Sequence, residues 1–346
     1  MVRCTVCFCF LALHPLACVT LVRVGLLPCC SFRYEREVVN CSLAEVPSVP
    51  SLDEGNLGMV HVAYASDSAN FAGVLASMTS LSRHLREAGR CRIHLIVSGA
   101  DMERAAQMVE CFRQNLSFSR VVPSVVLHRL IPVNISGLGT TYRRHLLKQQ
   151  TFARLHLHEY LPQTVSRVIW LDHDTIVKSD LRQLYQMRME HAIAAAWDHG
   201  HGDTRVGSRM RSYLPHLSPS ASKAIPDLDA RVFGTGVMVM DLDSWRSGGL
   251  ARGVEQWVAA LDGVEGEQLA MNVFFRDRFD VLDWRWNVMG LGWIRYRLPE
   301  HCIEQAHILH WSGPNRQKPW YQSWHRIRTH DDLFEPYDPR QRCDMS

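Results

Sequence analysis

Val168-Ile-Trp-Leu-Asp172-His-Asp174 joins an apolar run of strand length to two carboxylates. The run over 167–171 predicts a buried strand. Alternate residues of an extended segment point the same way, and a short turn can bring both carboxylates to one hard cation. Manganese or magnesium held there would bridge them to a diphosphate. An Asp-x-Asp triplet is common, so by itself it fits two exposed acids at a strand end equally well.

Strands and helices alternate on both sides of this stretch. Strands are predicted at 59–65, 92–97, 121–127, 167–171, 233–242 and 306–309, and helices at 70–87, 102–112, 141–160, 242–261 and 267–275. This alternation predicts an α/β domain with a largely parallel sheet. Ligands of such sheets bind beyond the carboxyl ends of the strands, where the acidic residues stand. The segment 198–228, rich in Gly, Ser, Pro and His, is expected to form a long loop or lid over the site.

The composition describes a globular protein and excludes several classes of site. Of 346 residues, 47% are hydrophobic and 21% are charged, which argues against extensive disorder. The formal net charge is only +3 and no long basic run occurs, so no nucleic-acid partner is expected. The chain carries no Gly-x-Gly-x-x-Gly and no P-loop pattern, so nicotinamide and ATP sites of those types have no support.

The N-terminus predicts targeting to the secretory pathway. Residues 4–22 contain no Asp, Glu, Lys or Arg, and as a helix they would span roughly 28 Å, close to a bilayer core. A signal-anchor is expected; a cleaved signal peptide and a buried core helix are the alternatives. Asn-x-Ser sequons at Asn40, Asn115 and Asn134 favour a lumenal domain. The expected order is an N-terminal signal-anchor over 1–30, a flexible stem over 31–57, the main domain over 58–330 and a C-terminal tail over 331–346.

The cysteines allow disulfides but do not define their pairing. Six of the eleven lie in the first thirty residues, and the others are Cys41, Cys91, Cys111, Cys302 and Cys343. In an oxidising lumen one or two disulfides can form among these five, which leaves an odd cysteine over.

A second functional stretch, His310-Trp-Ser-Gly313-Pro-Asn-Arg-Gln-Lys318-Pro-Trp320, follows the last predicted strand. An imidazole at a strand end suits a transition metal as third ligand. A glycine lets backbone approach phosphate closely, and a lysine neutralises charge on a diphosphate leaving group. The chain has eighteen histidines, so His310 alone fits a surface or packing residue as well; the grouping carries the argument.

Five blocks in this order make the chain resemble family 8 of the retaining glycosyltransferases. The blocks are 63–67 (AYASD), 152–155 (FARL), 168–174 (VIWLDHD), 233–239 (FGTGVMV), and 310–313 (HWSG) with 318–320 (KPW). The resemblance covers residues 60–320 and implies a nucleotide-diphospho-sugar transferase (type A) fold, which is α/β and Rossmann-like with a mixed, mainly parallel sheet flanked by helices. The stretch 282–292 and the tail 324–339 resemble eukaryotic secretory-pathway members, nearest the animal glycosyltransferase 8 domain-containing proteins.

The resemblance also implies an activity. It is the manganese-dependent transfer of a hexosyl or pentosyl group from a UDP-sugar to a glycan, protein or lipid acceptor. The resemblance further implies a single-pass protein of the Golgi or endoplasmic reticulum membrane, with its catalytic domain (58–330) in the lumen. Asp172, Asp174 and His310 would hold manganese. The UDP-sugar would be contacted by Ala65, Asp67, Asp172, Gly313 and Lys318. Arg154, Glu267 and Gln268 would act beside the reacting sugar.

The chain departs from the family pattern at a few positions. The family usually has Asn where Gly234 stands, Asp where Glu267 stands, and two fewer residues between Gly313 and Lys318; Asn70 is out of step in the nucleotide-binding turn. These departures leave open an inactive relative that keeps UDP-sugar or glycan binding. A metal-dependent hydrolase of nucleotide sugars is a further alternative. No residue stands out as a buried nucleophile, which favours same-face attack over a covalent intermediate.

Overall fold

The computed structural model describes residues 37–38, 41, 58–116, 122–134, 147–199, 205–210, 215, 217, 219–225, 227–263, 266–293, 296–321, 330–338 and 343. The expected signal-anchor and most of the expected stem lie outside these residues. Within the described ranges, no helix combines the length and the apolar character that a bilayer crossing requires.

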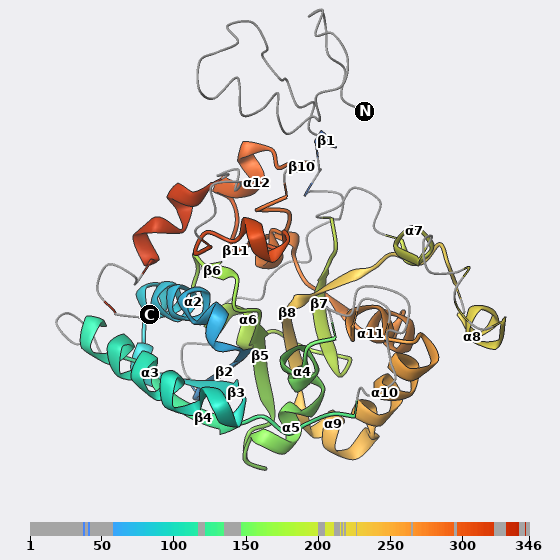
Figure 1. Ribbon diagram of the computed structural model, residues 1–346, viewed down its shortest axis with the longest axis horizontal. Coiled ribbons are helices and arrows are strands. Elements are labelled where there is room, and N and C mark those ends of the chain that lie inside the picture. Colours follow the sequence, from blue (N-terminus) through green and yellow to red (C-terminus); the bar gives the residue numbers. More distant parts are fainter. Residues whose placement is uncertain are drawn as a thin grey trace, which may run out of the picture.

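A seven-stranded sheet forms the centre of the domain (Figure 1), in the order β4-β3-β2-β5-β8-β7-β9. Its strands are β2 (Val60–Ser66), β3 (Cys91–Val97), β4 (Ser124–Arg129), β5 (Arg167–Leu171), β7 (Ile193–Trp197), β8 (Phe233–Asp241) and β9 (Asp280–Val281). Paired strands are parallel except at β8, which runs antiparallel to both β5 and β7. The predicted mixed, mainly parallel sheet is therefore confirmed.

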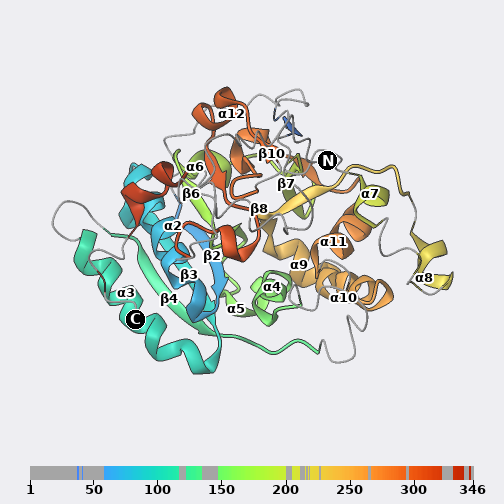
Figure 2. The same ribbon diagram turned by 45° about the horizontal axis from the view of Figure 1, so that its top comes forward.

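Helices cover both faces of this sheet, which explains why its central strands are buried along almost their whole length and are mainly apolar. On one face lie α2 (Phe71–His84) and α3 (Met102–Leu116); on the other lie α9 (Leu242–Gly248), α10 (Leu250–Ala260) and α11 (Gln268–Phe275), as Figure 2 shows. Alternate residues of β5 belong to the two cores: Val168 and Trp170 to one, Ile169 and Leu171 to the other. The remaining helices are short: α4 (Gln149–Phe152), α5 (Leu157–Tyr160), α6 (Arg182–Tyr185), α7 (Val206–Met210), α8 (Pro219–Ala224) and α12 (Glu300–Glu304).

One predicted helix changes type along its length, and another is interrupted. In the described part of 141–160, helical structure runs without a break over 149–160, from α4 through a 3₁₀ turn (Ala153–His156) to α5, and Arg154 of that turn bonds the Thr235 carbonyl. The predicted helix 242–261 is α9 and α10, separated at Gly249, whose φ of 58° suits a glycine at a helix end. The expected loop 198–228 carries α7 and α8.

A small second sheet brings distant parts of the chain to the carboxyl edge of β5. It pairs β6 (Thr175–Val177) antiparallel with β11 (Ile308–His310), so that His310 lies opposite Thr175. The Trp311 amide also donates to the Asp174 carbonyl at 2.9 Å. His310 therefore lies beside the two predicted carboxylates.

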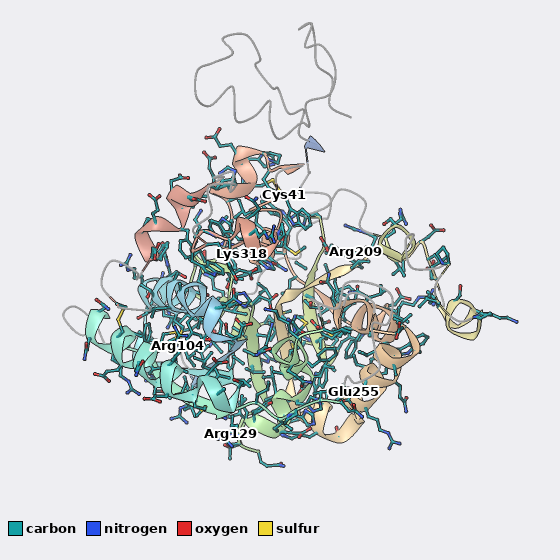
Figure 3. The ribbon with its side chains drawn as sticks, viewed as in Figure 1. Cys41, Arg104, Arg129, Arg209, Glu255 and Lys318 are labelled. Carbon is teal, nitrogen blue, oxygen red and sulfur yellow. A yellow bond between two sulfur atoms is a disulfide. The ribbon has the colours of Figure 1, made fainter. Side chains whose placement is uncertain are left out.

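Two disulfides tie residues near both ends of the chain to the domain. Cys41 bonds Cys302 of α12, and Cys343 bonds Cys111 of α3, each with Cα atoms 6.0 Å apart. Figure 3 labels Cys41 at its place beside the folded domain. Cys91 is left over and buried. The prediction of one or two disulfides with an odd cysteine is confirmed, and the structure supplies the pairing. A further pairing within the expected stem joins β1 (Glu37–Val38) to β10 (Tyr296–Arg297).

Candidate active site

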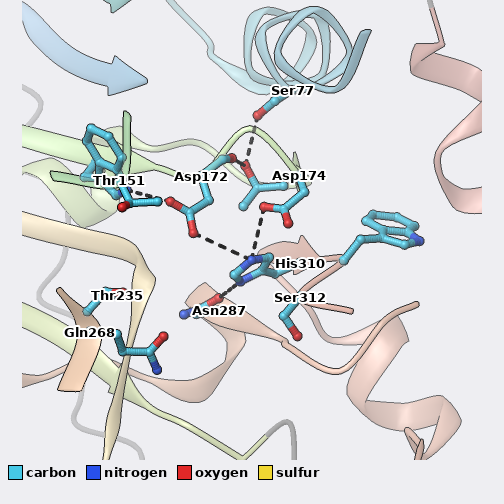
Figure 4. A network of polar contacts seen from close by, with 12 residues as sticks. Ser77, Thr151, Asp172, Asp174, Thr235, Gln268, Asn287, His310 and Ser312 are labelled. Atoms are coloured by element: carbon cyan, nitrogen blue, oxygen red, sulfur yellow. Dashed lines mark hydrogen bonds and ion pairs between the residues drawn. The ribbon is translucent and has the colours of Figure 1, made fainter. Parts of the chain in front are cut away.

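Three predicted ligands meet at the carboxyl edge of the sheet. Asp172 follows β5, Asp174 ends the next turn, and His310 ends β11 (Figure 4). One ligand atom from each lies within 4.8 Å of the others. Nε2 of His310 is 3.2 Å from Oδ1 of Asp174 and 4.0 Å from Oδ2 of Asp172. The structure thus brings together the three residues predicted to bind the metal.

Each carboxylate has one oxygen engaged by the protein and one turned to this shared point. Oδ1 of Asp172 accepts from Arg154 at 2.9 Å and from the Trp170 indole at 2.8 Å. Oδ2 of Asp174 accepts from the Lys318 ammonium, whereas its buried Oδ1 has no hydrogen-bond donor among the described residues. Burial by itself raises the pKa of Asp174, but the charges of Lys318 and His310 hold that pKa well below its usual range.

The third ligand completes a set that fits a divalent cation. Nδ1 of His310 lies 2.9 Å from Oδ1 of Asn287, to which it donates when it carries the proton. The lone pair of Nε2 then faces the oxygens of Asp172 and Asp174, an arrangement that requires a cation or a second proton at the centre. Two carboxylates and one imidazole suit manganese, and three protein ligands leave positions for substrate oxygens.

Two glycines of β8 make room for this arrangement. A Cβ on Gly236 would lie 2.2 Å from Cε1 of His310, so a larger residue would displace the ring. A Cβ on Gly234 would lie 2.8 Å from the Met289 sulfur and 3.0 Å from Nδ2 of Asn287. The space into which the family's Asn would extend is therefore occupied here by Met289 and Asn287.

Arg154 links Asp172, one of the predicted metal ligands, to Glu267, which was predicted to act beside the reacting sugar. Its side chain is 4% exposed; it donates to the Thr235 carbonyl at 2.6 Å and lies 3.2 Å from the Glu267 carboxylate. Its guanidinium also stacks over the Trp170 ring, 4.6 Å from the centroid. With Asp172 as its other partner, Arg154 has carboxylates on two sides, which compensates for burying its charge.

Glu267 directly precedes α11, and Gln268 is the first residue of that helix. Burial raises the pKa of the Glu267 carboxyl, and the Arg154 charge opposes this shift without cancelling it. Nε2 of Gln268 is 3.5 Å from Oδ2 of Asp198, a buried acid at the end of β7. Arg209 of α7 pairs with the same carboxylate.

Asp198 and Arg209 were not predicted, although one signal was present. Asp198 stands directly after a buried strand, as Asp172 does after β5. The carboxyl ends of β5 and β7 open toward the same edge, so the position of Asp198 in the sequence could have suggested its presence in the site. Arg209 comes from the segment expected to cover the site.

The predicted nucleotide end of the site lies at the end of β2. Ala65 is buried within that strand, and Asp67 follows it. Asp67 accepts from Lys148 at 2.9 Å and from Asn70 at 2.6 Å. Burial acts to raise the pKa of Asp67, but the bond and charge of Lys148 outweigh it and lower the pKa. Lys148 carries no sequence signal, because no motif surrounds it.

Lys318 and Gly313 pack within the site wall. The Lys318 ammonium bonds Asp174 and the Trp311 carbonyl, so in this structure it neutralises a metal carboxylate. A Cβ on Gly313 would lie 2.4 Å from the Gly292 carbonyl carbon, so the glycine permits two backbones to cross. The extra residues between them form a 3₁₀ turn at Asn315–Gln317.

Comparisons with known proteins agree with this architecture. The model of glycosyl transferase family 8 matches residues 61–323. The probable galacturonosyltransferase-like 9 of Arabidopsis thaliana is 29% identical over 316 residues, which cover 89% of this chain and 78% of the relative. The probable galacturonosyltransferase-like 8 of the same plant is 27% identical over 319 residues, with 89% and 78% covered.

Solved structures share the fold at lower identity. The galactosyltransferase LgtC, bound to donor and acceptor sugar analogues, has a TM-score of 0.58 at 18% identity, covering 81% of this chain and 96% of its own. Mouse xyloside xylosyltransferase 1 has a TM-score of 0.53 at 18% identity, covering 76% and 99%. The fold is therefore that of the type A nucleotide-sugar transferases. With the family match spanning most of the chain, this protein belongs to glycosyl transferase family 8.

Proposed function

We propose that this glycosyltransferase moves a hexosyl or pentosyl group from a UDP-sugar to a glycan, protein or lipid acceptor, with manganese as its cofactor and with retention of configuration. The observation that carries the proposal is the convergence of three ligand atoms from Asp172, Asp174 and His310. They lie beyond the carboxyl end of β5, where α/β sheets bind ligands. A divalent cation there would act as a Lewis acid on the departing diphosphate.

The surrounding residues are arranged to hold this site rigid. Arg154 pairs with both Asp172 and Glu267, so it couples the position of a proposed metal ligand to that of the proposed nucleophile or stabiliser. Glu267 is buried and paired, which makes it a poor free nucleophile, and this supports same-face attack. Gln268 and Asp198 carry the polar groups that would bind and orient the sugar. Asp67 would bind the uracil or ribose end of UDP. In this structure its carboxylate accepts a hydrogen bond from Lys148.

We further propose that the domain works in the lumen of the Golgi or endoplasmic reticulum. The disulfides Cys41–Cys302 and Cys111–Cys343 support an oxidising compartment, because cytosolic thiols are kept reduced. Anchoring through residues 1–30 is part of this proposal.

The decisive experiment measures UDP release by protein purified from a secretory host. A panel of UDP-galacturonate, UDP-galactose, UDP-glucose and UDP-xylose is assayed with manganese and with chelator, beside the double variant Asp172→Asn, Asp174→Asn. We expect release with one donor, dependent on manganese and reduced at least ~100-fold in the variant. Galacturonate, galactose and xylose follow the names of the similar proteins, and glucose adds one further hexose to the panel.

Each alternative has its own outcome. UDP binding that manganese tightens, without turnover of any donor across a panel of acceptors, would identify an inactive binding relative. Sugar release that exceeds transfer with every acceptor would identify a hydrolase. Nuclear magnetic resonance of the product should show the anomeric configuration of the donor, and an inverted product would refute retention.

A further inference from the structure

We propose that Asn287 is a positioning residue that presents Nε2 of His310 to the metal ion; this inference rests on the metal-dependent function proposed above. The stretch 282–287 (LDWRWN) resembles the family, and its last residue contacts His310 without being one of the proposed metal ligands. Oδ1 of Asn287 lies 2.9 Å from Nδ1 of His310, and both side chains are buried. An acceptor at this position keeps the proton on Nδ1 and leaves Nε2 free as a ligand.

The backbone holds this pair in register. The segment 285–288 runs beside β11, and the His307 amide donates to the Arg285 carbonyl at 2.7 Å. Farther along, the Val288 amide donates to the Ile308 carbonyl at 3.0 Å, and the His310 amide donates to the Val288 carbonyl at 2.9 Å. Asn287 is thus carried by a ladder of main-chain hydrogen bonds to the strand that carries His310.

The turn before Asn287 is also fixed. A 3₁₀ helix (Trp284–Asn287) begins after Asp283, whose carboxylate accepts from the Arg285 amide at 2.9 Å. Trp286 is buried and packs on the His307 ring, with centroids 4.6 Å apart. These contacts restrict the backbone on which the Asn287 amide is mounted.

The amide is retained at a cost, which points to its oxygen as the useful atom. Nδ2 of Asn287 is buried without a hydrogen-bond partner among the described residues, and burying an unsatisfied donor is unfavourable. A leucine would fill a similar volume without that cost. Only the bond to His310 distinguishes the amide from an apolar filler, because it selects one tautomer of the imidazole.

The reversed amide would have the opposite effect. With Nδ2 toward the imidazole, Nδ1 of His310 would accept and Nε2 would carry the proton toward Asp174. A protonated Nε2 cannot bind a metal. The proposal therefore predicts a single amide orientation, which can be tested.

The test measures manganese binding by electron paramagnetic resonance in the full chain. Wild type is compared with Asn287→Leu, Asn287→Asp and the double variant Asp172→Asn, Asp174→Asn, and thermal unfolding is recorded without metal. We expect Asn287→Leu to weaken manganese binding 10- to 100-fold, as losses of such partners do, and Asn287→Asp, which still accepts, to preserve it. The melting temperature of the metal-free protein reports whether each variant folds.

Two results would overturn the proposal. Manganese affinity of folded Asn287→Leu equal to that of wild type would show that Asn287 only fills space, while the metal site and the proposed function stand. No manganese binding by wild type would remove the metal site and this inference together.

A second measurement decides the matter if Asn287→Leu does not fold. Long-range ¹H–¹⁵N spectra of the metal-free wild type at pH 8 report the tautomer of His310, assigned by its absence in His310→Gln. We expect the proton on Nδ1, the nitrogen that faces Asn287, whether or not Nε2 carries a second proton in the absence of metal. An Nδ1 without a proton would overturn the inference.

Discussion

One methyl group added at Gly236 should destroy the metal site while the sheet still forms. A Cβ at this position would lie 2.2 Å from Cε1 of His310 and 3.0 Å from Oδ2 of Asp172. Carbon atoms in contact lie about 3.5 Å apart, so the imidazole would have to move by roughly 1 Å. His310 is buried and bonded to Asn287, so this movement takes Nε2 away from the carboxylates.

The size of the effect follows from that displacement. A bond from a metal to an imidazole nitrogen is about 2 Å long, so the shift is about half a bond length. Misplacing a catalytic group by about 1 Å costs roughly 10²-fold in rate. We therefore expect manganese affinity and turnover of Gly236→Ala to fall about 100-fold. Overpacking costs about 1–3 kcal/mol of folding stability, and a strand gains about 0.5–1 kcal/mol when alanine replaces glycine, so the net loss should be small.

The assay combines manganese titration, UDP release and thermal unfolding. Gly58→Ala is the matched control, because a Cβ at Gly58 would meet nothing within 4 Å. It should match wild type in all three measurements. Manganese affinity and turnover of folded Gly236→Ala close to wild type would refute the reasoning, since the methyl group could then be accommodated without moving His310.

Three further predictions concern the buried polar groups and the disulfides. Arg154→Lys keeps the charge but loses the planar fork that reaches Glu267, so turnover should fall about 10- to 100-fold in the UDP-release assay; equal turnover would show that one point charge suffices. Burial and neighbouring positive groups lower the pKa of His94 to about 3, so the unfolded chain takes up a proton below about pH 6.5 that the folded chain does not. The stability that comes from keeping His94 neutral is thus fully present above pH 6.5 and is lost as the pH falls toward 3. Urea unfolding at several pH values should show a free energy of unfolding that falls with falling pH, and His94→Gln should reduce this slope by at most about 1.4 kcal/mol per pH unit. Replacing Cys111 and Cys343 by Ser opens a link between residues 232 positions apart, and guanidinium unfolding should show a loss of about 2–5 kcal/mol; an unchanged midpoint would mean that this link does not constrain the unfolded chain.

Much of the architecture could be predicted because its signals are local. Apolar runs of strand length end in carboxylates at Asp67 and Asp172, and strand-helix alternation suffices to predict a mainly parallel sheet with its site at the carboxyl edge. The grouping of the three proposed metal ligands was also predictable, since Asp172 and His310 stand at the ends of apolar runs and Asp174 follows Asp172 by two positions. The helix predicted over 141–160 is confirmed over residues 149–160, but its middle turn is 3₁₀, a local change that hydrophobic periodicity does not register.

The class of fold, the family and the types of ligand atom follow from the sequence alone, because periodicity and motif order are properties of residues close together in the chain. Only the tertiary structure decided which atoms meet. Lys318 bonds Asp174 across 144 positions, and Asn287 reaches His310 through a strand ladder that no local pattern encodes. The two disulfide pairings were decided in the same way. Such contacts depend on how strands from distant segments come to lie side by side. A contact that closes a long loop produces no repeating pattern in the sequence around the residues that it joins.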